Sequence, residues 1–258
     1  MQTVHGGPEA LFRVTDLVCE PTRATGRMLL GPWSTSMTGR TSLGALGVLA
    51  DDTLGYAIVA HAPAGSWSVS IEITLDLIAE LPGPGAVLWA EATLAGADDA
   101  GAVAEGSVLD EHGRLLARTS QRGRWVSLEG LRDPLLEWDA VPRPPADATF
   151  ADVVREPASV GDVYLLRTDR ATGNNMGVVH GGTSIAAAAA VAEEALHEAD
   201  EPLRITSLRI NYPRPTLTGS RVHVSSALVY RGRSLGVVDV TTRADGADRT
   251  LTRITAEA

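Results

Sequence analysis

The clearest chemical signal in the sequence is a histidine followed by two glycines. A polar turn that begins at Asn174 leads into His180-Gly181-Gly182, and an alanine-rich segment continues to Glu194. Because alanine has the highest helix propensity, we predict a loop that feeds a buried helix. The first amides of a helix lack intrahelical partners and lie at the positive end of its dipole, where glycines leave them open. Such amides can stabilise a carbonyl oxygen that becomes negative during a reaction.

Two adjacent carboxylates, Asp51 and Asp52, lie in an apolar part of the first half. Leucines and alanines recur there at helical spacing, which predicts a helix from about Ser42 to Ala60. A buried carboxylate without partners is costly, so an inward-facing aspartate in this helix is a candidate site residue. We assign that position to Asp51 and a solvated position to Asp52. The alternative is that both lie on a solvated helix face.

The chain repeats one α+β unit. In each half a helix is followed by strands with period-two alternation, separated by Gly or Asp turns. The expected organisation is an N-terminal lead-in at 1–23, a first unit at 24–125, a linker or crossover at 126–159 and a second unit at 160–258.

The chemical groups are divided between the two units. An offset of 138 residues (180 − 42) aligns His180 with Ser42 and Ala189 with Asp51. The first helix therefore has a carboxylate but no histidine at its start. The second helix has the histidine at its start but no carboxylate at the matching position. Each half contains what the other lacks.

Two motifs carry a resemblance to a known family: Asn174-x-x-Gly177-x-x-His180-Gly181-Gly182, and Leu49-Ala50-Asp51 followed by Gly55. Together they resemble the hotdog-fold acyl-CoA thioesterases of the PaaI-like group, here as a fused double hotdog. The resemblance extends over about 24 to 125 and 160 to 256. It implies two tandem hotdog units, each with a long central helix wrapped by an antiparallel sheet, that form an intramolecular pseudo-dimer.

The family also implies one active site between the units, with the acid from the first and the Asn and HGG turn from the second. The catalytic candidates are Asp51, Gly181, Asn174 and His180, and the substrate-binding candidates are Gly182 and Ser68. The Gly181 amide would bind the thioester oxygen, while Asp51 would act as general base or as nucleophile, two routes that stay open. Asn174 would position the water or the carboxylate, Ser68 would help to position the water, and His180 would fix the turn or contact the thioester.

The mirror-image site is expected to be inactive. There Ser36, Ser42 and Leu43 would face Ala189, which has no acidic group. Glu193 lies one helical turn beyond Ala189 and could replace the missing acid, or it could belong to a solvated helix end.

Composition excludes several classes of protein. The net charge of -10 argues against a phosphate-tracking surface for nucleic acid, and Cys19 alone cannot form an internal disulfide. No membrane span, signal peptide or metal-ligand spacing of the six histidines is evident, so we expect a cytoplasmic protein without metal or cofactor. The expected partner is an acyl-CoA substrate, with a homodimer of double-hotdog chains as a further expectation.

Two other functions remain alternatives. A non-catalytic acyl-CoA binding or sensing module would be favoured if Asp51 faced solvent. A hotdog hydratase would carry an Asp and His pair in a different motif, which the sequence lacks.

Overall fold

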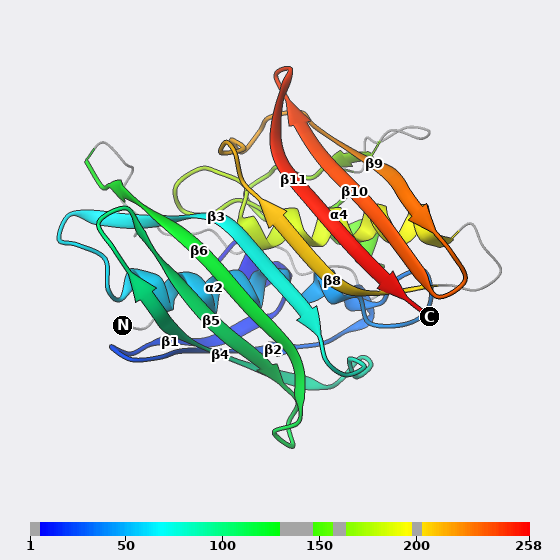
Figure 1. The fold of residues 1–258 in the computed structure, drawn as a ribbon, viewed down its shortest axis with the longest axis horizontal. Helices are drawn as coiled ribbons and strands as arrows, with labels where there is room; N and C mark the ends of the chain where they lie inside the picture. The colour runs from blue at the N-terminus through cyan, green and yellow to red at the C-terminus, as the bar shows by residue number, and fades with distance from the viewer. Residues whose placement is uncertain (1–5, 130–146, 157–163, 198–202) are drawn as a thin grey trace.

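The structure is a computed structural model that describes residues 6–129, 147–156, 164–197 and 203–258. Its strands form one antiparallel sheet in the order β1-β2-β4-β5-β6-β3-β8-β11-β10-β9-β7 (Figure 1). The first-half strands are β1 (Val14–Cys19), β2 (Ala24–Leu29), β3 (Ser66–Leu77), β4 (Val87–Ala97), β5 (Gly101–Leu109) and β6 (Leu115–Ser127). The second-half strands are β7 (Tyr164–Leu166), β8 (Arg204–Asn211), β9 (Val222–Arg231), β10 (Leu235–Ala244) and β11 (Ala247–Glu257).

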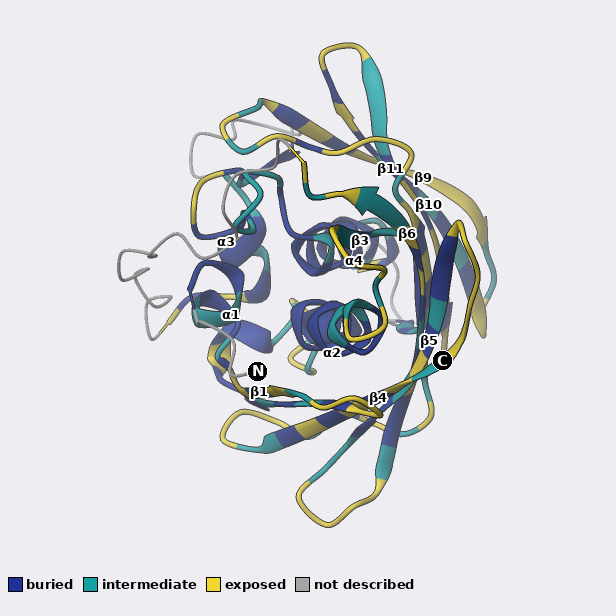
Figure 2. Cartoon of the chain, turned by 90° about the vertical axis from the view of Figure 1, so that its left-hand side faces the viewer, coloured by how far each residue is buried: buried dark blue, intermediate teal, exposed yellow. Residues whose placement is uncertain are grey.

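Two long helices, α2 (Gly47–Val59) and α4 (Gly181–His197), lie next to each other inside the curve of this sheet (Figure 2). Glycines allow the close approach of α2 to the start of α4. A Cβ atom on Gly182 would meet the backbone of Gly47 and Val48, and a Cβ atom on Gly47 would meet the carbonyl of Gly182. Because neither glycine has a side chain, the backbones of the two helices can lie in contact.

The two halves are joined by the pairing of β3 with β8. Leu75 lies opposite Leu208 and Ile73 opposite Ile210, so the sheet continues from one half into the other. A central helix wrapped by sheet in each half, with the two sheets continuous, confirms the predicted double-hotdog fold and its pseudo-dimeric arrangement.

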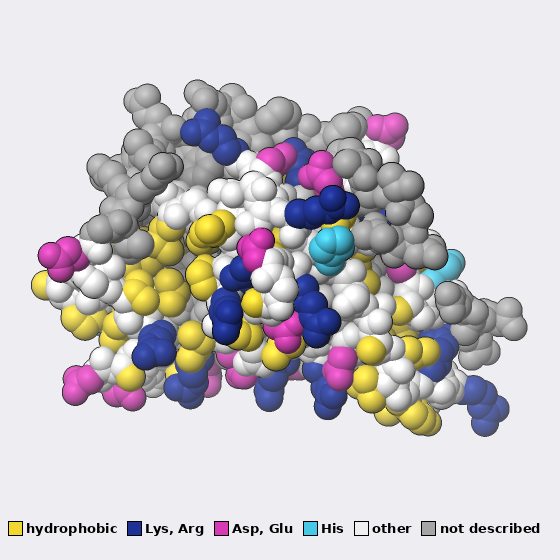
Figure 3. Space-filling view, turned by 90° about the horizontal axis from the view of Figure 1, so that it is seen from above, with side chains coloured by type: hydrophobic (Ala, Val, Ile, Leu, Met, Phe, Trp, Pro, Cys, Tyr) yellow, Lys and Arg dark blue, Asp and Glu magenta, His cyan; other side chains and the backbone are white. Residues whose placement is uncertain are grey.

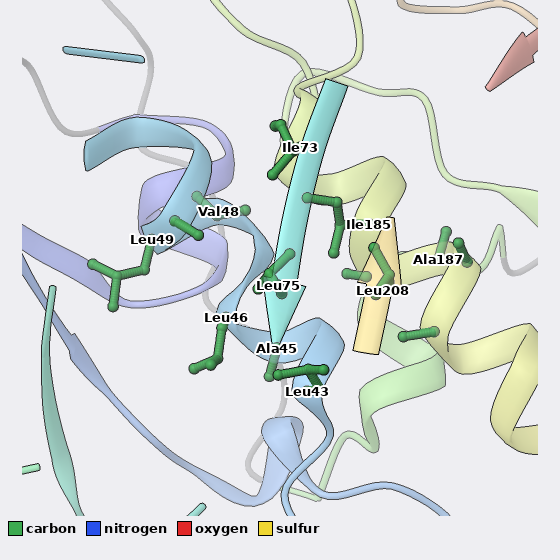
Figure 4. Close-up of a cluster of buried hydrophobic side chains, with 14 of the residues drawn as sticks. Leu43, Ala45, Leu46, Val48, Leu49, Ile73, Leu75, Ile185, Ala187 and Leu208 are labelled. Atoms are coloured by element: carbon green, nitrogen blue, oxygen red, sulfur yellow. The ribbon is translucent and has the colours of Figure 1, made fainter. Parts of the chain in front are cut away.

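The core lies between the sheet and the two helices. In the close-up, Leu75 of β3 and Leu208 of β8 lie beside Ile185 of α4, and Val48 and Leu49 project from α2 (Figure 4). All five are buried. Because full burial of one such side chain contributes about 1.5–3 kcal/mol, the two helices are held chiefly by apolar packing on the sheet and on each other.

Local boundaries differ from the predictions at the helix starts. The helix expected from Ser42 begins as a 3-10 turn, η2 (Leu43–Leu46), before α2 starts at Gly47. The Ser42 hydroxyl accepts a hydrogen bond from the Gly44 amide at 3.2 Å, which caps this turn.

The lead-in and the linker contribute more structure than their sequence suggested. The lead-in holds a short helix, α1 (Pro8–Leu11), and its β1 pairs with β2 at the edge of the sheet. The linker segment holds α3 (Phe150–Val154), which starts in a capping box formed by Thr149 and Asp152 and packs on α4. Residues 130–146 and 157–159 of the linker lie outside the described residues.

On the face drawn in Figure 3, cationic, acidic and hydrophobic side chains are interspersed. Across the described ranges, every helix is too short or too polar to cross a bilayer.

Candidate active site

Asp51 lies in the middle of α2 and faces the turn that precedes α4. Its side chain is buried, with a residue exposure of 8%. Its Oδ2 accepts a hydrogen bond from the Gly182 amide at 2.9 Å, and its Oδ1 accepts one from the Ser70 hydroxyl at 3.1 Å. The predicted meeting of the first-half acid with the second-half glycine turn is therefore present in the fold.

His180 lies between two carboxylates. Its Nδ1 is 3.2 Å from Asp51 Oδ2 and its Nε2 is 3.1 Å from Asp52 Oδ1. Burial alone would lower the pKa of His180, but Asp51 and then Asp52 outweigh it and raise the pKa to about 10. The imidazole is then a cation that links the turn to α2.

The Gly182 amide has two acceptors within reach. It points at Asp51 Oδ2 and, at 3.1 Å, at His180 Nδ1. A protonated Nδ1 cannot accept a hydrogen bond, so with His180 charged the Gly182 amide donates to Asp51 alone. The Asp51 carboxylate then accepts the Gly182 hydrogen bond and contacts the charged imidazole.

The structure corrects the prediction for Asp52. We expected it in solvent, but it is only 6% exposed and its Oδ1 contacts His180. The reason is that α2 is covered on this side as well, by the HGG turn and by the N-terminal helix α1. On α1, burial and then the charge of Asp52 raise the pKa of Glu9 to about 8.

Glu9, Asp52 and His180 form the one group of three potential metal ligands in the described ranges whose ligand atoms all lie within 4.8 Å of one another. Metal binding would require a neutral imidazole. Because Asp51 and Asp52 raise the pKa of His180, a metal at this group would have to displace the imidazole proton.

Two residues that the sequence analysis missed complete a chain of hydrogen bonds behind Asp51. Gln121 of β6 donates from Nε2 to Ser70 Oγ at 2.9 Å, and Ser70 of β3 donates to Asp51. Gln121 is almost fully buried. A polar side chain at an inward position of β6 was the available signal, because buried amides are found where they have hydrogen-bond partners.

Ser68, the serine named from the sequence, is a near neighbour of Ser70, and its predicted role in positioning water stays a prediction. It lies two residues earlier in β3, where a Cβ atom on Gly123 would collide with its hydroxyl and meet Ile58. Ile58 is about two turns along α2 from Asp51. Ser68 therefore does not contact the Asp51 carboxylate.

The Asn174 side chain stabilises the turn in which it lies. Its Oδ1 accepts hydrogen bonds from the amides of Met176 at 3.0 Å and Val178 at 3.3 Å. Gly177 in this turn has a φ of 75°, a backbone conformation that favours glycine. In the described parts of the chain no hydrogen bond joins Asn174 to Asp51, so its predicted role in positioning water stays a prediction.

Gly181 lies beside the acid, and only a glycine fits there. A Cβ atom at this position would be 2.6 Å from Asp51 Oδ2 and 3.1 Å from the Tyr212 hydroxyl. Tyr212 donates from that hydroxyl to the Gly181 carbonyl at 2.9 Å, and burial keeps its pKa well above the usual value. With its carbonyl fixed in this way, the Gly181 peptide has a set orientation at the start of α4.

Two family models match the sequence. The one described as the acyl-CoA thioesterase C-terminal domain matches residues 21–124, and the one described as the acyl-CoA thioesterase N-terminal domain matches residues 170–257. Between them they match most of the chain. The chain belongs to the acyl-CoA thioesterase family. The predicted enzyme class, a thioester hydrolase, is confirmed at this level, although the matched family is broader than the PaaI-like group.

The halves of this thioesterase match the two family domains in reverse order. The half that supplies Asp51 matches the C-terminal domain of the family, and the half that supplies the HGG turn matches the N-terminal domain. The site depends on how the halves pack across β3 and β8, which does not depend on which half comes first in the chain.

Solved structures of thioesterases share the fold. The 12:0-ACP thioesterase from Umbellularia californica has a TM-score of 0.62 and 12% identity, with 91% of this chain and 94% of that chain covered. A tesB protein from Mycobacterium avium subsp. paratuberculosis has a TM-score of 0.60 and 8% identity, with 96% of each chain covered. An acyl-ACP thioesterase from Bacteroides thetaiotaomicron has a TM-score of 0.58 and 15% identity, covering 91% and 98%. None of the curated proteins matches the sequence.

Proposed function

We propose that this thioesterase hydrolyses an acyl-CoA thioester to a free acid and CoA at one active site per chain, located between the two halves. The observation that carries the proposal is the position of Asp51. A buried carboxylate from α2 lies within hydrogen-bonding distance of the amide of Gly182 and directly beside Gly181, at the start of the opposite helix.

The oxyanion would be bound by the Gly181 amide. This amide is at the positive end of α4, and it makes no hydrogen bond with another residue in the described part of the chain. A thioester oxygen placed there would receive a hydrogen bond that strengthens as the carbonyl becomes tetrahedral. Loss of one such donor typically costs roughly 100- to 1000-fold in kcat.

Asp51 would act on the water. In one route its carboxylate removes a proton as the water oxygen forms a bond to the thioester carbon, and the tetrahedral intermediate then breaks its carbon–sulfur bond to release CoA as a thiolate. Each Asp51 oxygen keeps a lone pair beside its hydrogen bond from Ser70 or Gly182, so direct nucleophilic attack by Asp51 stays the second route. A thiolate is a stable enough anion to leave without a general acid.

His180 would position the site. Its contacts with Asp51 and Asp52 fix the turn against α2, and its raised pKa makes it a poor base at neutral pH. Asn174 would keep the turn in shape, and Gly182 would orient the carboxylate.

The alternative of a non-catalytic acyl-CoA binding module would be favoured if Asp51 faced solvent or if CoA esters bound without hydrolysis. Its 8% exposure and its contact with the helix start instead support an enzyme. The cytoplasmic location remains part of the proposal. A homodimer of these chains also remains a proposal, although both halves of the site come from one chain.

The test is hydrolysis of acyl-CoAs of increasing chain length, followed by release of the CoA thiol. We expect turnover of at least one acyl-CoA and none of the matched thioether, in which the scissile bond is absent. Binding of these compounds without release of thiol from any acyl-CoA would contradict the proposal and support the binding module.

A further inference from the structure

The Tyr212 hydroxyl lies at the proposed active site, where the reaction proposed for Asp51 gives it no role. Tyr212 directly follows β8, and its hydroxyl donates a hydrogen bond to the Gly181 carbonyl at 2.9 Å. A Cβ atom on Gly181 would be 3.1 Å from this hydroxyl and 2.6 Å from Asp51 Oδ2. The tyrosine hydroxyl and the acid therefore lie on the same side of Gly181.

The backbone of Tyr212 is fixed at the seam between the two halves. Its amide donates a hydrogen bond to the Ile71 carbonyl of β3 at 3.1 Å. Ile71 directly follows Ser70 and lies where the register of the β3–β6 pairing shifts. Such a shift adds a residue to one strand and re-aims the side chains beside it. The part of β3 that directs Ser70 to Asp51 therefore also anchors Tyr212.

One peptide group joins Tyr212 to Asp51. The carbonyl of Gly181 and the amide of Gly182 belong to the same planar peptide group, so their directions are coupled. Tyr212 donates to the carbonyl end, and the amide end donates to Asp51 Oδ2 at 2.9 Å. Hydrogen bonds in such a chain polarise one another, by roughly 10–30% per bond. The Tyr212 hydroxyl therefore orients the Gly182 amide and strengthens its hydrogen bond to the acid.

The direction of this chain is set by its two ends. Burial, with the charge of Asp51 adding to it, keeps the pKa of Tyr212 well above the usual value, so the phenol keeps its proton at neutral pH. A carbonyl oxygen can only accept a hydrogen bond, so the hydroxyl proton points at Gly181. The chain therefore donates from Tyr212 towards Asp51.

We propose that Tyr212 is a positioning residue for Asp51 that acts through the peptide group between Gly181 and Gly182. It supports Asp51 Oδ2 from the second half, as Ser70 supports Oδ1 from the first half. The inference rests on the proposed function only for its effect on turnover, because the strength of the hydrogen-bond chain can be measured without turnover.

The experiment removes the Tyr212 hydroxyl and keeps its ring. Tyr212→Phe should lower kcat for the most rapidly hydrolysed acyl-CoA roughly 3- to 10-fold, as expected for one lost hydrogen bond, and leave KM within about twofold. In the ¹H–¹⁵N NMR spectrum the Gly182 amide proton should move upfield, because its hydrogen bond to the carboxylate becomes weaker. Since the aromatic ring is retained, a change in ring current does not account for such a shift.

Tyr164→Phe is the matched control. Tyr164 is a buried tyrosine of β7 whose hydroxyl has no hydrogen-bond partner among the described residues. Its ring lies under the guanidinium of Arg155. This variant should keep kcat within about twofold and leave the Gly182 signal in place. If Tyr212→Phe fails to fold, substitution of 3-fluorotyrosine for Tyr212 replaces it. That residue keeps the hydroxyl and makes it a stronger donor, so the Gly182 signal should then move downfield.

Equal effects of Tyr212→Phe and Tyr164→Phe on kcat would overturn the inference. A loss of kcat with the Gly182 signal unchanged would also overturn it, because the hydroxyl would then act by a route other than the peptide group. An unmoved signal with 3-fluorotyrosine has the same meaning. A lack of turnover of every acyl-CoA by the unmodified protein would instead contradict the proposed function, and an upfield Gly182 signal in Tyr212→Phe would still support the hydrogen-bond chain.

Discussion

At the scale of residues, the proposed chemistry depends on which atoms touch the Asp51 carboxylate. Both of its oxygens accept hydrogen bonds, from Gly182 and from Ser70, and Ser70 is itself held by Gln121. Sequence alone could identify Asp51 and the glycine turn, since both belong to recognisable local motifs. It could not identify Gln121, because a hydrogen bond that joins β6 to β3 depends on strand pairing and not on a local motif.

The hydrogen bond from Ser70 to Asp51 gives a prediction at this scale. Ser70→Ala removes the hydrogen bond to Asp51, and a hydrogen bond to a charged group contributes about 1.5–3 kcal/mol, so kcat should fall roughly 10- to 100-fold. Ser68→Ala, two residues away in the same strand, should leave kcat within about twofold, because it does not touch the carboxylate. Steady-state kinetics with an acyl-CoA substrate distinguish the two. A larger loss for Ser68→Ala would favour Ser68 as the serine that positions the water.

At the scale of elements, the central feature is the contact of α2 with the start of α4. The sequence correctly predicted that glycines would keep the surface of α2 thin. The sequence did not predict the burial of Asp52, because its solvent exposure depends on how α1 and the HGG turn cover the outer side of α2. A single amphipathic pattern cannot reveal a helix that is covered on every side.

Two glycines of α2 test this packing. Gly47→Ala would place a methyl group on the Gly182 carbonyl and against Ile185, so we expect a loss of stability of about 1–3 kcal/mol or more. Gly55→Ala, in the same helix, meets only the Gln121 amide at 3.8 Å. It should raise stability by about 0.5–1 kcal/mol through the better helix propensity of alanine. Urea unfolding followed by circular dichroism measures both, and similar effects of the two changes would contradict the close helix contact.

His180 makes the link between these elements depend on pH. Its pKa is raised from 6.5 to about 10, so the stabilisation is fully present below pH 6.5 and is lost as pH rises through 10. Glu9 and Glu193, with pKa values raised from 4.5 to about 8, act in the same direction between pH 4.5 and 8. The free energy of unfolding should therefore fall from pH 5.5 to pH 10.

Between pH 8.5 and 10 both glutamates are mostly ionised, and Cys19, whose pKa burial raises above 9.0, contributes equally with and without His180, so a comparison with a His180 variant reports the histidine. In this window the unmodified protein should lose stability with rising pH, and His180→Asn should lose less. Denaturant unfolding at several pH values supplies the comparison. A steeper slope for His180→Asn would show that the imidazole is not held as a cation.

At the scale of the whole molecule, the proposed reaction centre takes different parts from two similar halves. The sequence predicted this division. At the 138-residue offset, Asp51 of the first half aligns with Ala189, and His180 of the second half aligns with Ser42. Strand pairing of β3 with β8 then brings the retained parts together. At the mirror-image position Ser42 donates a hydrogen bond to Glu193, and sequence alone could name Glu193 but not its partner.

The most direct test of the shared centre is the turnover of Asp51→Asn compared with Asp52→Asn. The two substitutions remove neighbouring carboxylates from one helix, and only Asp51 contacts both the Gly182 amide and Ser70. With the circular dichroism spectrum unchanged, Asp51→Asn should lower kcat by at least about 1000-fold, as expected for a lost general base. Asp52→Asn keeps a hydrogen-bonding group for His180 and should lose less than about tenfold. Equal losses for the two variants, or full activity of Asp51→Asn, would contradict a reaction centre built on Asp51.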